Sequence, residues 1–147
     1  MADTNPKGPS LNQGRLLTIL IVAALFAIGT FQTLSGSRGY ITTAMDEVHL
    51  GVCGTYGGTL FVELDTITDV QLVDALSFGT RIEGAETGNT VSGIYTNEAF
   101  GSYWVHAYTD VPAYILVTYP EGVLVFNCES AAKTETLYSS LAEAAAR

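Results

Sequence analysis

The chain has 147 residues, 48% of them apolar, and carries a net charge of −9. This length allows one ordinary domain with a terminal appendage. From Asp46 onward, fourteen carboxylates stand against only three basic side chains, so this part of the chain carries a charge of −11. Nucleic acids and anionic lipid headgroups are bound through clustered Lys and Arg, so the charge argues against both as ligands.

Residues 1–14 mix Pro, Gly, Asn and Ser without periodicity, which predicts a short flexible tail. The run that follows, residues 16–37, contains no charged residue and lies between Arg15 and Arg38. As a helix it is long enough to cross a hydrocarbon core of about 30 Å. We therefore predict a transmembrane helix over residues 15–35, which would anchor a single-pass protein in the cell membrane.

The same run has a second interpretation as a cleaved secretory signal, because Ser35 and Ser37 offer a small-x-small cleavage site. The apolar run is longer than the usual core of such a signal, about 7–15 residues, and no A-x-A motif follows it, which favours the uncleaved anchor. Lys7 and Arg15 precede the span and only Arg38 closely follows it. This distribution favours a cytoplasmic N-terminus and an extracytoplasmic C-terminal domain.

Residues 36–46 have the small polar character of a linker, and the globular domain is expected over residues 47–147. Val48, Leu50 and Val52 alternate with less apolar residues, which predicts a half-buried strand. The glycine-bearing stretch SFGTRIEGAETGNTVSG is expected to form the longest connection, with a short strand near Arg81. Further strands are predicted over residues 59–63, 69–76, 102–108, 114–119 and 123–127.

The period changes from two to 3.6 at the end of the chain. Glu129 or Ser130 can cap a helix, and Leu137, Tyr138 and Leu141 then form one stripe that continues to Ala145. The pattern predicts a mainly β, antiparallel domain capped by one C-terminal α-helix.

Six short segments precede the terminal helix in this order: ITDVQLV, GIY, FGSYWVHAYTD, AYILVTY, PEG and VLVF. This order resembles the bacterial pleckstrin-homology-like (PH-like) domain family over residues 56–146. The resemblance implies a small, bent antiparallel PH-like barrel plugged by a helix, often carried by membrane-anchored proteins. It transfers no functional residues. The turn region GTYGGT lacks the basic side chains with which phosphoinositide-binding PH domains hold their ligand.

Ser102, His106 and Asp110 recur every four residues, as a catalytic triad on a helix would. On a strand each step would span about 13 Å, far beyond the reach of a proton relay. The residues around His106 favour a strand, so we expect no nucleophilic catalysis and no catalytic residue.

Four residues can act as soft metal ligands: His49, Cys53, His106 and Cys128. They occur singly, without the paired spacing of a zinc site, so no metal and no cofactor are expected. Cys53 and Cys128 lie in the first and after the last predicted strand, and closure of a barrel would allow a disulfide between them; two separate thiols are the alternative.

The strand around Trp104 has aromatic or apolar residues on both faces, which requires a cover on each. The C-terminal helix can supply part of that cover. Alternatively, the face of Trp104, His106 and Tyr108 stays partly exposed as an interaction surface for an unidentified protein. The sequence thus predicts a membrane-anchored, non-enzymatic interaction or structural module. The alternative is a sensor domain that binds a lipid or small ligand at the membrane surface.

Overall fold

A computed structural model describes residues 39–147, which belong to one compact unit. This unit is mainly β, with two sheets and one C-terminal helix. The predicted tail and the predicted transmembrane helix over residues 15–35 lie outside the described residues. Within residues 39–147, no helix is both long enough and apolar enough to cross a membrane.

The smaller sheet contains β1 (Thr42–Met45), β2 (His49–Cys53) and β3 (Thr59–Glu63) in that order, all antiparallel. The prediction of a linker over 36–46 is therefore wrong for its second half, because residues 42–45 form β1. Val48 was expected to face inward but is 55% exposed. The Asp46 carboxylate accepts hydrogen bonds from the backbone N–H groups of Val48 and His49. This turn removes Val48 from the strand.

The larger sheet has six strands in the order β4-β8-β9-β7-β6-β5. All its pairings are antiparallel except that of β7 with β9, which is parallel. A 3₁₀ helix, η1 (Leu64–Thr66), leads from β3 towards this sheet. The strands are β4 (Asp69–Val73), β5 (Thr80–Thr87), β6 (Thr90–Asn97), β7 (Gly101–Tyr108), β8 (Tyr114–Tyr119) and β9 (Gly122–Phe126).

The glycine-bearing stretch is a hairpin of β5 and β6 rather than the long connection predicted from its composition. Gly84 and Gly93 lie opposite each other in this pair. A Cβ atom at Gly84 would lie only 2.2 Å from the carbonyl oxygen of Ser92. The two glycines therefore allow a close approach of two backbones within the sheet, which a sequence pattern does not distinguish from a loop.

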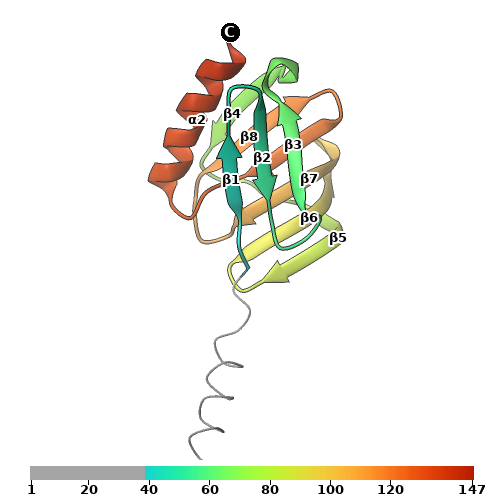
Figure 1. Cartoon of the computed structure of the whole chain (residues 1–147). Coiled ribbons are helices and arrows are strands. Elements are labelled where there is room, and N and C mark those ends of the chain that lie inside the picture. The colour runs from blue at the N-terminus through green and yellow to red at the C-terminus, as the bar shows by residue number, and fades with distance from the viewer. Residues whose placement is uncertain (1–38) are drawn as a thin grey trace, which may run out of the picture. The chain divides into compact units, whose positions relative to one another are not determined.

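The bent PH-like barrel that the resemblance implies is not closed, because the two sheets have no strand in common. In Figure 1 the three-stranded sheet lies over one face of the six-stranded sheet. One core fills the space between them. Its buried members include Leu50, Val52, Ile115, Leu124 and Phe126.

The opposite face of the six-stranded sheet carries a second core with Tyr103, Val105 and Val125. β4 and β5 are the two edge strands of this sheet, so residues 74–79 must cross a face to connect them. Phe78 in this connection packs edge-on against Tyr114, with ring centroids 5.4 Å apart. The connection thus provides the second cover that the two-sided apolar strands require.

Helix α2 (Ala131–Ala145) begins after Ser130, whose hydroxyl accepts a hydrogen bond from the Lys133 N–H at 3.3 Å. Leu141 is fully buried, whereas Leu137 and Tyr138 are half-buried against the core between the sheets. The predicted capped helix and its apolar stripe are therefore confirmed. The helix packs on β4 and β8 and flanks β1 (Figure 1).

Candidate functional site

The predicted interaction surface on β7 is divided by the three-stranded sheet that covers it. His106 is only 1% exposed, so it adds no surface, and the expectation of an exposed His106 is wrong. Trp104 and Tyr108 are half-buried. Trp104 lines a groove beside β3, and Tyr108 lines a larger groove beside β1. The three side chains share one face, and only the outer two reach a groove.

His106 forms a buried hydrogen-bonded cluster with Ser92, its partner across β6 and β7. The Ser92 Oγ lies 2.7 Å from His106 Nδ1, and Trp104 stacks on the imidazole with centroids 5.7 Å apart. The Tyr56 N–H donates to Ser92 Oγ, and Ser92 Oγ donates to the Tyr56 carbonyl, both at 3.0 Å. A serine hydroxyl carries one hydrogen, so donation to Tyr56 requires His106 to donate from Nδ1.

This cluster clamps the β2–β3 turn to the larger sheet. Burial lowers the pKa of His106 from 6.5 to about 4, so the imidazole is neutral at neutral pH. A Cβ atom at Gly54 would lie 2.3 Å from both His106 Nδ1 and Ser92 Oγ. Gly54 therefore packs directly over the buried Ser92–His106 pair.

The sequence triad is not assembled. Ser102 is exposed near the start of β7, and Asp110 lies beyond its end. The Asp110 carboxylate accepts hydrogen bonds from the Asn89 amide at 3.1 Å. Ser102, His106 and Asp110 therefore follow an extended strand, as the strand-forming residues around them predict.

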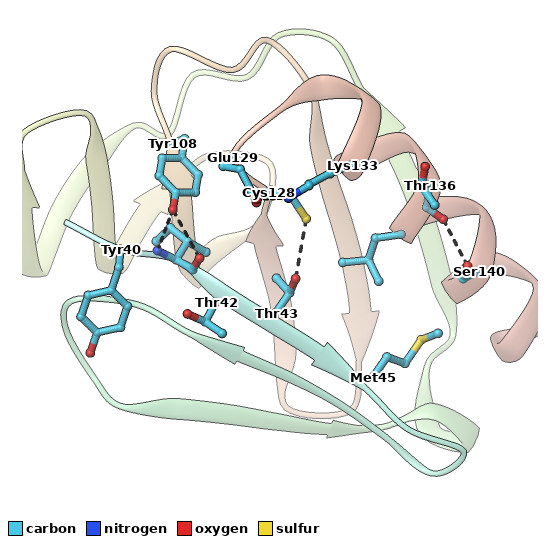
Figure 2. A pocket seen from close by; sticks show the side chains of 12 residues that line it. Tyr40, Thr42, Thr43, Met45, Tyr108, Cys128, Glu129, Lys133, Thr136 and Ser140 are labelled. Atoms are coloured by element: carbon cyan, nitrogen blue, oxygen red, sulfur yellow. Dashed lines mark hydrogen bonds and ion pairs between the residues drawn. The ribbon is translucent and has the colours of Figure 1, made fainter. Parts of the chain in front are cut away.

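A groove runs between the free edge of β1 and helix α2, and Figure 2 shows it. Its volume is about 880 Å³. β1 pairs with β2 on one side only, so its other edge has no strand partner among the described residues. The lining residues are Tyr40, Ile41, Thr42, Thr43, Met45, Tyr108, Cys128, Glu129, Lys133, Thr136, Leu137 and Ser140.

Hydrogen bonds hold the two walls of this β1–α2 groove in place. The Ile41 N–H donates to the Tyr108 hydroxyl at 3.2 Å, and the same hydroxyl lies 3.4 Å from the Ile41 carbonyl (Figure 2). Lys133 forms an ion pair with Glu129 at the start of α2. The Thr136 and Ser140 hydroxyls donate to helix carbonyls one turn earlier. The groove therefore offers apolar surface and hydroxyl oxygens, with its one cation already paired.

Both cysteines are free thiols, and the disulfide considered between Cys53 and Cys128 is not formed. Cys128 Sγ lies 3.6 Å from Thr43 Oγ1. Cys53 instead pairs with Thr42, and neighbouring residues of a strand face opposite sides of the sheet. Burial is the largest cause that raises the pKa of the Cys128 thiol, which keeps it neutral.

Residues 39–147 contain no group of three or more His, Cys, Asp or Glu side chains that would hold a metal ion. His49 and His106, the two histidines, lie in different surroundings: His49 is half-exposed beside Asp46, whereas His106 is buried beside Ser92. The soft ligands singled out in the sequence are thus not brought together in the described part of the chain.

Comparison with known protein families, with curated proteins and with solved structures gives no match to this chain.

Two features of these sites are not evident from the sequence. Ser92 lies in a stretch that its glycines mark as a loop, yet it is the hydrogen-bond partner of His106. The β1 wall of the groove comes from the expected linker. The alternation of Ile41, Thr43 and Met45 is the one signal that indicates a strand there.

Proposed function

We propose that this protein is a membrane-anchored, non-enzymatic interaction module. Its predicted transmembrane helix over residues 15–35 would hold the domain at the membrane, on the extracytoplasmic side. The domain would bind an extended segment of another protein in the β1–α2 groove.

The observation that carries this proposal is the free edge of β1 along an open groove. An exposed strand edge presents unpaired backbone N–H and C=O groups, and an incoming extended segment pairs with them as an added strand. Side chains of that segment would enter the groove against Met45 and Leu137. Main-chain pairing supplies affinity in such complexes, and the pockets for alternate side chains supply specificity.

A second candidate is a neutral lipid or small apolar ligand in the same groove. The groove volume of about 880 Å³ falls in the range of small-molecule sites, which is about 300–1,000 Å³. Ile41, Met45 and Leu137 provide an apolar wall, and Thr43 offers a hydroxyl group. This candidate fits the alternative of a sensor at the membrane surface.

We also propose a relation to the bacterial PH-like domain family. The succession of strands and the single C-terminal helix support it, together with the sequence segments that form these strands. The unclosed sheets and the parallel pairing of β7 with β9 mean that any such relation is one of element order more than of barrel geometry.

The test is co-purification from native membranes with a variant that fills the groove. Thr136→Trp places an indole in the groove, whereas Ser139→Trp adds the same side chain to an exposed α2 position that does not line it. A protein partner should be lost with Thr136→Trp and retained with Ser139→Trp, as measured by quantitative mass spectrometry. Loss of a bound lipid in place of a protein would support the second candidate, and no difference between the variants would contradict both.

A further inference from the structure

We propose a second binding site at the opposite edge of the three-stranded sheet, where the groove beside β3 binds a Lys or Arg side chain of an extended basic protein segment. This β3 groove is distinct from the β1–α2 groove. It has a volume of about 410 Å³ and is lined by Leu60, Phe61, Val62, Glu63, Thr66, Trp104, Tyr119 and Glu121.

The lining combines aromatic residues with carboxylates. Trp104, Tyr119 and Phe61 line the groove, and the exposed Glu63 and Glu121 supply two negative charges. A cation over an aromatic face is attracted by the ring quadrupole, and Trp gives the strongest effect. Neither carboxylate forms an ion pair within residues 39–147. The groove therefore offers both kinds of contact that an ammonium or guanidinium group requires.

The charge of the domain supports a basic occupant. Each of the three basic side chains in residues 39–147 is already in an ion pair: Arg81 with Glu86, Lys133 with Glu129, and Arg147 with Glu143. No lining residue of the β3 groove is basic. No basic side chain of the described residues neutralises the negative potential of the groove, so a basic partner can do so. The same potential raises the rate of encounter with such a partner.

The free edge of β3 indicates that the occupant is an extended chain. β3 pairs with β2 on one side, and its other edge has no strand partner within residues 39–147. Its sequence, TLFVE, contains neither Lys nor Pro, the usual protections of an edge strand, and Phe61 is 68% exposed. Glu63 and Glu121 would repel a second copy of this acidic chain. The edge is therefore open to pairing but selects a basic strand.

Titration of the full chain in phosphatidylcholine nanodiscs tests this proposal, with Trp104 as the reporter because it is the only tryptophan. The probe is a capped peptide of alternating Thr, Val and Lys, and its controls carry Gln or Glu in place of Lys. The Lys peptide should change the emission of Trp104 with saturation, and about 0.5 M salt should weaken its binding.

Two matched double variants distinguish the effect of the groove carboxylates on peptide affinity from the effect of the overall charge of the domain. Glu63→Gln with Glu121→Gln should weaken the Lys peptide about fivefold, as expected for two exposed ion pairs. Glu98→Gln with Glu135→Gln removes the same charge outside the groove and should leave the affinity within twofold. All four positions are exposed, so unchanged thermal unfolding should show that both variants are folded.

Several outcomes would overturn the proposal. They are equal binding of the Gln peptide, equal loss in both double variants, and no response of Trp104 to the Lys peptide. If the Trp104 emission changed with the phosphatidylcholine content, the groove would be assigned to a lipid headgroup. If it changed with the protein concentration, the groove would be assigned to a second copy of the chain. The β1–α2 groove takes no part in this experiment, so a failure here leaves the proposed function to its own test.

Discussion

Protonation of His106 should destabilise the domain as the pH falls from 6.5 towards 4. The imidazole is neutral and buried in the folded state, where its pKa is about 4, and it has an ordinary pKa of 6.5 when the chain unfolds. Between these values the unfolded state binds more protons, so the free energy of unfolding decreases as the pH falls. The full loss, reached below pH 4, is about 3 kcal/mol at about 1.4 kcal/mol per pH unit.

The assay is urea unfolding at a series of pH values, followed by Trp104 emission, which reports directly on the stacked imidazole. His106→Gln removes the titration and can still bond with Ser92, whereas His49→Gln removes the other, half-exposed histidine. The carboxylates titrate in both proteins, so their contribution drops out of the difference in unfolding free energy between wild type and His106→Gln. This difference should change by about 2–3 kcal/mol from pH 7 to 4, and His49→Gln should follow wild type. Parallel curves for wild type and His106→Gln, or a folded-state His106 pKa near 6.5 by NMR, would refute the reasoning.

Three further predictions follow from burial, hydrogen bonding and charge. Gly54→Ala should lower the free energy of unfolding by about 3 kcal/mol because its Cβ would collide with the His106–Ser92 pair, whereas the Cβ of Gly51→Ala would lie 3.2 Å from the exposed Phe61 ring and in ordinary contact with the Ala44 carbonyl, and should cost less than about 1 kcal/mol in the same urea assay. Tyr95→Phe should be neutral or stabilising because the buried Tyr95 hydroxyl has no hydrogen-bond partner among the described residues, whereas Tyr103→Phe should cost about 1 kcal/mol because it removes a 2.6 Å bond to the Phe78 carbonyl; equal thermal shifts would contradict this. The purified chain in nanodiscs should not capture phosphatidylserine vesicles at about 0.15 M salt, and capture that rises with phosphatidylserine content would show that the charge argument fails.

Local sequence patterns were sufficient to predict the elements that have both a clear hydrophobic period and a clear boundary residue. The strand over 59–63 and the strand over 114–119 were predicted at the bounds of β3 and β8, and Ser130 was one of the two predicted helix caps, with Glu129 as the other. Each has a clear period and a turn or cap residue at its end. The β5–β6 hairpin was missed because Gly84 and Gly93 serve a close approach of two strands, although glycines more often mark loops.

The candidate site was less accessible to sequence reasoning, because distant segments form it. The β1–α2 groove joins residues 40–45 to Tyr108 and to residues 128–140, and no local pattern encodes that proximity. The aromatic face of β7 was predicted, and part of its cover was expected from the C-terminal helix, but the β2–β3 turn covers His106. Residues on the three-stranded sheet and its turns decide that His106 is buried while Trp104 and Tyr108 reach grooves.

Photo-cross-linking in native membranes would test the proposed interaction module most directly. A photoreactive amino acid at Met45 lies in the β1–α2 groove, and the same group at Ile82, which is 57% exposed on β5, controls for general apolar contact. The account predicts one discrete protein adduct from position 45 that is absent from position 82 and is lost when Thr136→Trp fills the groove. Adducts of equal yield from both positions, or an adduct from position 45 that survives Thr136→Trp, would contradict it.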